Sequence, residues 1–235
     1  MCHLQQTSEL PPPGGTLMSF CANRQLSYGT VISGIIRDYI ATPDGACLRQ
    51  TQVLTPAIEA DTFVFSLYPT LPQGNYGAAD YVEVGRYPSG GKGGTTPNRK
   101  RGLLAIDLNN YIGAGSIPVR AILNLHVQSI AVSPSVGSPT VMIRRTESFD
   151  ENVATWSDTL APVPAPEEVV WHATSLGWVS INVTTLVDRC WNNESGVCYW
   201  IMSEEDEVDN ATNSLVSFGS SESADPPTLE IEYAP

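Results

Sequence analysis

The sequence predicts an all-β fold, an antiparallel β-sandwich preceded by an N-terminal arm or small subdomain. The first observation is the stretch 101–127, where two apolar runs alternate with the period of two that is typical of strands. The second is composition: 19 glycines and 18 prolines supply the turns that many short strands need. The third is spacing, since roughly eight to eleven such runs follow one another at the intervals of a sandwich.

The predicted elements divide the chain in two. Residues 1–57 form the arm, where 11–15 is a stiff and then flexible proline-glycine segment and the β-branched residues of 31–36 favour short strands. Residues 58–235 form the sandwich. Its strands are expected at 62–69, 81–84, 103–108, 121–127, 141–146, 177–187, 197–202, 215–219 and 228–233, with one helical turn around 188–191.

Charge limits the partners. The formal net charge is −13, from 25 acidic and 12 basic side chains, so nucleic acid and strongly anionic polysaccharides are poor partners. No apolar run reaches the roughly 18 residues of a membrane-spanning helix, and no membrane partner is expected. The N-terminus lacks the basic start and apolar stretch of a Sec signal, which predicts a chain that stays in the cytoplasm or leaves it without a signal.

The five cysteines lack the spacing of a zinc site. Cys190 and Cys198 flank a hairpin-like turn and can pair within the chain if the environment oxidises. Cys2, Cys21 and Cys47 lie in the first 50 residues, and the odd total leaves at least one thiol free or paired between chains. Buried, reduced cysteine is the alternative interpretation.

No catalytic motif is found, and the chain is predicted not to be an enzyme. Glu147, Asp150 and Glu151 are the carboxylates that a glycosidase would need, but a solvated loop is favoured there.

The sequence offers one candidate cation site. Glu204, Glu205, Asp206 and Asp209 are calcium candidates in an acidic loop. The spacing and the glycine of an EF-hand are missing, so a solvated loop is the favoured interpretation and no cofactor is expected.

The five tryptophans fall in the second half of the chain, and core or loop packing is their expected role. Trp156 and Trp178 in particular are predicted to lie in the core of the sandwich. A platform that stacks on sugars would instead need exposed aromatic rings.

An ordered series of motifs carries a resemblance to a known family. They are ADTF (60–63), NYGA (75–78), YVEVG (81–85), RGLLAIDL (101–108), IPVRAILNL (117–125), ESFDENVATW (147–156), GWVSINVT (177–184), SSES (220–223) and PTLEIEY (227–233). In this order the chain resembles the DNRLRE-domain family, over residues 58–235. The naming hexapeptide is absent, and 98–101 lies near its expected place.

The resemblance implies a jelly-roll-like β-sandwich related to the carbohydrate-binding modules of extracellular bacterial proteins, and a non-catalytic binding or scaffold role. Some members resemble alginate-binding modules, which need a cationic groove. That specificity is not carried over to this acidic chain.

Two functions follow as expectations. The first is a structural protein on the exterior of a virus particle, a bacteriophage head decoration, collar or fibre, because phage proteins assemble in the host cytoplasm and need no signal. It would dock to other virion proteins or to copies of itself through the N-terminal region, with Cys2, Cys21 or Cys47 available for a disulfide between chains. The alternative is the carbohydrate-binding module of a secreted or cell-surface protein, with an extracellular localisation and a glycan as partner.

Overall fold

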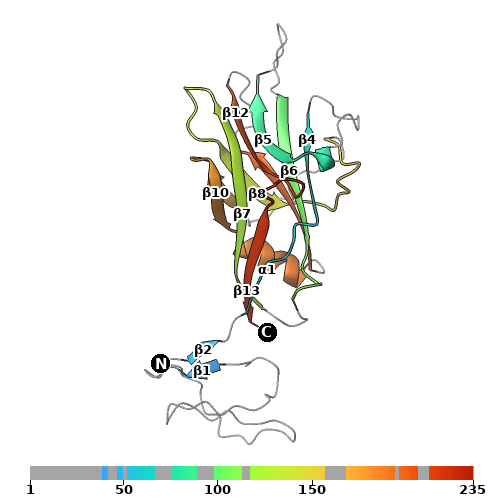
Figure 1. Ribbon diagram of the computed structural model, residues 1–235, viewed down its shortest axis with the longest axis vertical. Coiled ribbons are helices and arrows are strands. Elements are labelled where there is room, and N and C mark those ends of the chain that lie inside the picture. The colour runs from blue at the N-terminus through green and yellow to red at the C-terminus, as the bar shows by residue number, and fades with distance from the viewer. Residues whose placement is uncertain are drawn as a thin grey trace, which may run out of the picture.

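The structure is a computed structural model that describes residues 39–41, 47–49, 52–66, 76–88, 98–112, 117–156, 168–193, 196–205 and 212–234 (Figure 1). Within these ranges eleven strands form one continuous antiparallel sheet, which confirms the all-β prediction. Two further strands, β1 (Tyr39–Ala41) and β2 (Cys47–Arg49), pair with each other. The arm strands expected at 31–36 and the proline-glycine segment lie outside the described residues.

Strand pairing divides the large sheet into two groups. The first is centred on β7 (Ile117–Val132) and also contains β3 (Gln52–Leu54), β5 (Tyr81–Tyr87), β10 (Gly177–Asn182), β12 (Ser214–Gly219) and β13 (Thr228–Ala234). The second is centred on β6 (Asn98–Asp107) and contains β4 (Ala60–Phe65), β8 (Thr140–Arg145), β9 (Val169–His172) and β11 (Val197–Glu204). A short pairing of Gly85–Tyr87 with Asn98–Lys100 joins them.

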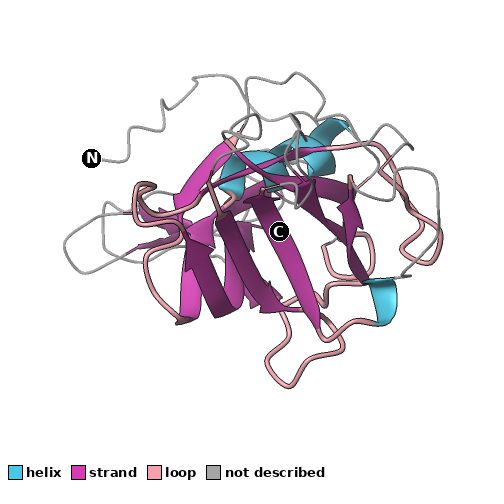
Figure 2. Cartoon of the chain, turned by 90° about the horizontal axis from the view of Figure 1, so that it is seen from above, coloured by secondary structure: helices cyan, strands magenta, loops and turns pink. Residues whose placement is uncertain are grey.

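One hydrophobic core lies between the two groups. Alternate residues of each strand turn inward, as the period of two requires. The core takes Val82, Leu123, Leu125, Val216 and Phe218 from the first group and Phe63, Leu104, Ile106, Val141 and Trp200 from the second. Trp200 is fully buried and is the largest side chain of this core. Figure 2 looks down on these strands from above.

A second, smaller cluster covers the other face of the β6 group. Leu103, Ile201 and Val64 point away from the main core, and Phe149, Ala154 and Trp156 pack over them. Trp156 is therefore only partly buried and lies outside the sandwich core to which the sequence assigned it. The Arg101 guanidinium lies 4.4 Å from the centre of its ring.

Strand β7 pairs on both edges. On one edge, β13 pairs with its first half and β12 with its second half, one after the other along the strand. On the opposite edge, β10 pairs with Ile122–Val127. The connection 220–227 between β12 and β13 therefore lies beside the middle of β7, on the edge that these two strands share.

Helix α1 (Thr184–Asn193) follows β10 directly and packs against β7 and β11. It buries Leu186, Val187 and Cys190, which share one face at helical spacing. Asn182 begins the helix by accepting hydrogen bonds from the Thr184 backbone N–H (3.0 Å) and hydroxyl (2.7 Å). The helix is longer than the single turn expected, and no helix of the described residues has the length and apolarity to cross a membrane.

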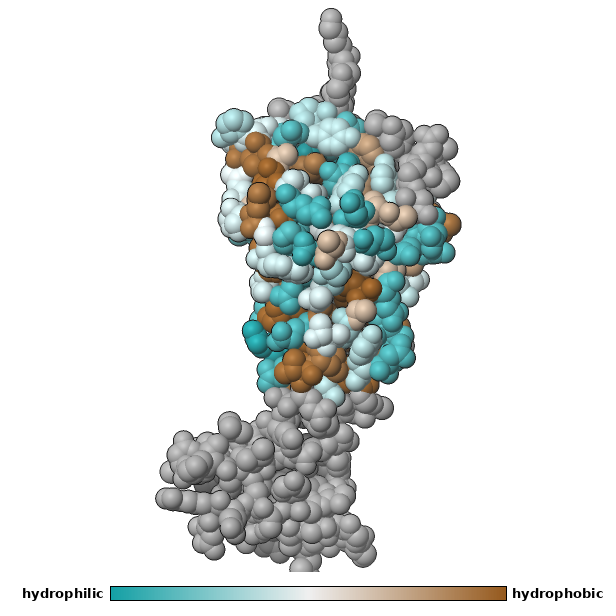
Figure 3. Space-filling model, in the orientation of Figure 1, coloured by the Kyte–Doolittle hydropathy of each residue, from teal (hydrophilic) through white to brown (hydrophobic). Residues whose placement is uncertain are grey.

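The structure differs from the predicted elements in two further places. Strand β9 was not predicted from the sequence, although VVWH carries β-branched residues. Strand β3 pairs with β13, so the sheet includes residues on the N-terminal side of the boundary expected at 58. Figure 3 shows hydrophilic and hydrophobic patches interspersed over the described surface that faces the viewer in Figure 1.

Candidate functional site

Trp178 stands out because its large ring is exposed on a sheet face. Its side chain is 54% exposed, and it is the only tryptophan among the exposed large hydrophobic side chains of the described residues. Along β10 the apolar Val179 and Ile181 turn toward the core, while Trp178, Ser180 and Asn182 turn outward. The prediction that Trp178 belongs to the core is therefore wrong.

The residues of β7 opposite Trp178 and Ser180 complete a polar surface. Trp178 pairs with His126 and Ser180 pairs with Asn124, while Thr228 of β13 pairs with Asn124 on its other side. These side chains share the outer face of three adjacent strands. We call the surface made of Asn124, His126, Trp178, Ser180 and Thr228 the Trp178 face.

Hydrogen bonds run across the Trp178 face. The Ser180 hydroxyl donates to the Asn124 side-chain carbonyl over 2.6 Å, and the Asn124 amide N–H donates to the Thr228 hydroxyl over 3.4 Å. The chain of bonds fixes the Asn124 amide while the surface stays open to solvent. Each of these groups keeps lone pairs or hydrogens for a further partner, since an amide and a hydroxyl each make several hydrogen bonds.

The ring of Trp178 is held by His126. Their ring centres lie 5.2 Å apart at an interplanar angle of 49°. On the other side of His126, its Nδ1 lies 3.4 Å from Oδ2 of Asp225, without the alignment of a hydrogen bond. Asp225 places a carboxylate at the border of the Trp178 face.

Asp225 belongs to a connection that is tightly fixed. Its backbone N–H donates to the Ser223 hydroxyl (3.2 Å), and that hydroxyl donates to the Ser220 carbonyl (2.8 Å). The Ser221 N–H donates to Oδ2 of Asp61 over 2.7 Å. Gly219 is required beside it, because a Cβ atom there would lie 2.5 Å from the Asp225 carbonyl oxygen.

Asp61 is a buried carboxyl in an acidic surrounding. Burial, with the neighbouring charges of Glu222 and Glu151, raises its pKa to about 7 despite the hydrogen bond from Ser221. Its Oδ1 atom is buried without a hydrogen-bond partner. Glu151, whose pKa burial also raises, accepts a hydrogen bond from the Asp61 N–H (3.2 Å).

Two of the three glycosidase candidates, Asp150 and Glu151, accept hydrogen bonds from the backbone. Asp150 accepts hydrogen bonds from the backbone and side chain of Asn152, at 2.9 and 3.2 Å, which shapes the turn after Phe149. Glu151 faces the backbone of β4. Glu147 is exposed in the segment that precedes the turn.

Two of the four calcium candidates, Glu204 and Glu205, lie in the described residues. Glu204 is buried and forms an ion pair with Arg86 at 2.5 Å, while Glu205 is exposed. Asp206 and Asp209 lie outside the described residues. No group of three or more metal-binding side chains gathers in the part of the chain that the structure describes.

The structure contains the predicted disulfide within the chain. Cys190 and Cys198 form a disulfide that links α1 to β11 across Gly196. Cys47 lies in β2, and no side-chain position is described for it, while Cys2 and Cys21 lie outside the described residues. A disulfide between chains through Cys2, Cys21 or Cys47 stays a prediction.

The sequence contained a signal for the Trp178 face. In the run 177–182 the apolar Val179 and Ile181 alternate with Ser180 and Asn182, so Trp178 shares the polar side by register alone. The side chains that β7 and β13 contribute had no such signal, because one sequence does not show which distant strands pair with each other.

The Trp178 face has the chemistry to hold a polyhydroxylated ligand. A tryptophan ring offers an apolar surface with a polar edge, and the adjacent amide and hydroxyls offer donors and acceptors. Comparison with known proteins points to the same kind of ligand: the model of carbohydrate-binding module family 96 matches residues 51–233. No curated protein matches the chain.

Proposed function

Because the chain belongs to carbohydrate-binding module family 96, we propose that it binds a neutral glycan through the Trp178 face and leaves that glycan chemically unchanged. Modules of this class bind carbohydrate without catalysis, which agrees with the absence of a catalytic motif in the sequence. The matched residues include every member of the Trp178 face.

The exposure of Trp178 carries this proposal. A ring that is 54% exposed on a sheet face has not been used to stabilise the core, and burial against a ligand would remove apolar surface from water. A sugar ring has an apolar face of C–H groups and an equatorial rim of hydroxyls. The first suits the indole, and the second suits Asn124, Ser180 and Thr228, which lie within the same three strands.

Charge supports a neutral ligand. The chain carries a net charge of −13, and the carboxylate of Asp225 borders the Trp178 face. A polyanion such as alginate would meet repulsion from both. A neutral polysaccharide meets none.

The virus-particle role expected from the sequence has no supporting observation in the fold or in the comparison, and it stays a prediction, as does docking through the N-terminal region. The carbohydrate-binding alternative is the better supported of the two. An extracellular setting accompanies it as part of this proposal.

The test is binding to immobilised or soluble polysaccharides. Xylan, galactomannan, laminarin and hydroxyethylcellulose serve as neutral probes, and alginate and polygalacturonate serve as anionic ones. We expect retardation by at least one neutral polysaccharide in affinity gels, and its loss in Trp178→Ala.

Tyr111→Ala is the matched control, since Tyr111 is also an exposed aromatic residue (39%) and lies outside the Trp178 face. It should bind as the wild type does. Binding that survives Trp178→Ala, or no binding to any neutral polysaccharide, would overturn the proposal.

A further inference from the structure

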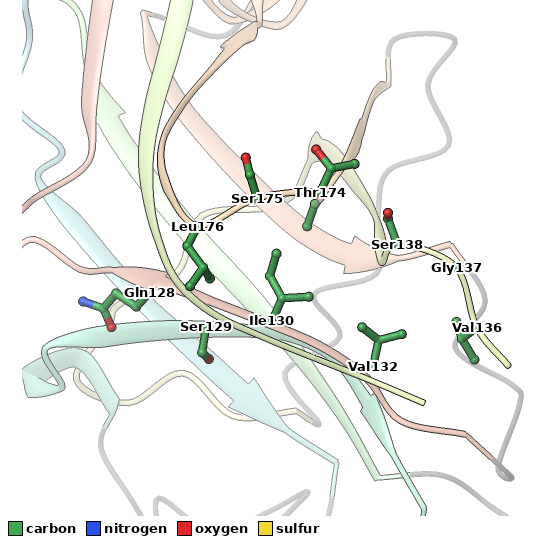
Figure 4. A pocket seen from close by; sticks show the side chains of 11 residues that line it. Gln128, Ser129, Ile130, Val132, Val136, Gly137, Ser138, Thr174, Ser175 and Leu176 are labelled. Atoms are coloured by element: carbon green, nitrogen blue, oxygen red, sulfur yellow. The ribbon is translucent and has the colours of Figure 1, made fainter. Parts of the chain in front are cut away.

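A groove of about 600 Å³ lies beside β7, just before strand β10 begins (Figure 4). Two connections border it. One, 133–139, leads from β7 to β8, and the other, 173–176, leads from β9 to β10. The Ala173 N–H donates to the Pro139 carbonyl over 2.9 Å and ties the two connections together.

The groove exists because the edge of β7 is open there. The pairing of β10 with β7 ends at Gly177 and Val127. On the opposite edge, β12 continues to pair as far as Val132. Residues 128–132 thus have one strand partner instead of two among the described residues, and the space beside them is the groove.

The walls of the groove carry no charge, in a chain whose net charge is −13. Ile130 and Val132 of β7 and Leu176 of the connection 173–176 supply aliphatic surface, and Figure 4 shows Ser138 and Thr174 across from Ile130 and Val132. An uncharged groove that combines aliphatic and hydroxyl groups suits an uncharged ligand with both kinds of surface.

The polar side chains of the groove are available to a ligand. Gln128, Ser138, Thr174 and Ser175 make no side-chain hydrogen bond to another described residue. Thr174, Ser175 and Ser138 are exposed. These groups can therefore donate and accept without breaking a bond of the fold.

The groove adjoins the Trp178 face. Leu176, which is 63% exposed, precedes Trp178 by two residues, and Gln128 follows His126 by two residues along β7. From His126 to Val132 the strand advances about 20 Å at about 3.3 Å per residue. A ligand that covers both regions would have to be an extended chain.

We propose that the groove is the second half of an elongated site, and that it takes further sugar residues of the same neutral, linear glycan whose first residues stack on Trp178. The inference rests on the proposed function. It assigns the ligand class as an oligosaccharide longer than a disaccharide, and it gives the groove residues a part in choosing chain length.

The experiment compares short and long ligands. Disaccharides and hexasaccharides of β-1,4-linked glucose, mannose and xylose, and of β-1,3-linked glucose, are titrated calorimetrically into the full chain. Ser138→Trp fills the groove with an indole, and Leu176→Ala removes aliphatic surface from its wall. Ser135→Trp is the matched control, because Ser135 is exposed in the same connection but does not line the groove.

We expect the wild-type protein to bind the hexasaccharide at least about tenfold more tightly than the disaccharide. Ser138→Trp and Leu176→Ala should remove that advantage and leave disaccharide affinity unchanged, while Ser135→Trp should change neither. Trp178→Ala should weaken the binding of both ligands.

Failure of the groove and failure of the proposed function give different results. Trp178-dependent binding that does not increase with chain length, or that keeps its increase in both groove variants, overturns the groove assignment and leaves the proposed function standing. An absence of binding to every oligosaccharide overturns both.

Discussion

Trp178 and His126 face each other across the pairing of β10 with β7, with ring centres 5.2 Å apart, and the tryptophan ring is 54% exposed. The contact orients the indole without burying it. A ring held in place on an open surface loses little conformational freedom when a ligand binds, which favours affinity.

The first prediction separates this surface from the core. Trp178→Ala should lower the free energy of unfolding by less than about 1 kcal/mol, because the residue loses only one ring contact and little buried area. Urea unfolding followed by circular dichroism measures the change. A loss of several kcal/mol would mean that Trp178 supports the fold, and its effect on glycan binding would then need another explanation.

The alternating apolar residues predicted the strands and much of the core. Leu104, Ile106, Leu123 and Leu125 alternate in the sequence and are fully buried in β6 and β7. The sequence did not show where these strands lie. Strands β6 and β7 belong to different groups and do not pair, because partner choice depends on contacts between residues distant in sequence.

The tryptophans show why residue type alone misassigns a site. Trp178, Trp156 and Trp200 are equally apolar in sequence, yet one is exposed, one half-buried and one fully buried. What distinguishes them is the direction of each side chain from its strand or loop. Alternation within 177–182 fixes that direction for Trp178, whereas Trp156 lies in a connection where no periodicity applies.

The second prediction concerns Trp200. Trp200→Ala should lower the free energy of unfolding by about 3–5 kcal/mol, because it empties a fully enclosed part of the core. Trp156→Ala should cost about 1–2 kcal/mol, since Trp156 is partly exposed and loses the contact with Arg101. Chemical unfolding of both variants tests whether Trp200→Ala loses more stability than Trp156→Ala. Equal losses would contradict the two-cluster description of the apolar residues.

If Trp200→Ala is too unstable to purify, Trp200→Phe keeps most of the side-chain volume. It should lower the free energy of unfolding by about 1–3 kcal/mol, because the smaller ring leaves part of the space empty. A Trp200→Phe protein as stable as the wild type would argue that the site is loosely packed.

The third prediction concerns the buried ion pair of Arg86 with Glu204. The two side chains are 3% and 5% exposed, and Arg86 also donates to the Thr212 hydroxyl over 3.2 Å. Arg86→Met should destabilise the protein by about 3–5 kcal/mol, because it removes a cation that is paired with the buried Glu204 carboxylate. The double variant Arg86→Met/Glu204→Leu should be more stable than Arg86→Met alone.

Arg144→Met is the control for this prediction. Its pair with Glu168 is similar in distance, 2.6 Å, but is 27% and 42% exposed, so its loss should cost less than about 1 kcal/mol. Thermal unfolding of the four proteins at neutral pH gives the comparison. A double variant less stable than Arg86→Met would show that Glu204 has favourable contacts besides Arg86.

The last prediction is a pH dependence that originates at Asp61. The pKa of this carboxyl is about 7 in the folded protein, against an ordinary value of 3.8. Between these values the folded state holds a proton that the unfolded state has released, so stability falls as pH rises through this window. The full loss is on the order of 4 kcal/mol, reached once the folded carboxyl has ionised near neutral pH.

Asp61→Asn removes the titrating group and keeps the shape. Its amide oxygen can still accept from the Ser221 N–H, and its amide nitrogen can occupy the position of Oδ1, which has no hydrogen-bond partner. The stability of Asp61→Asn relative to wild type should therefore increase from pH 5 to pH 8, with Glu230→Gln, an exposed carboxylate of β13, as the control that shows no such trend. Guanidinium unfolding at both pH values measures the difference, and a difference that is constant with pH would place the folded pKa of Asp61 near its ordinary value.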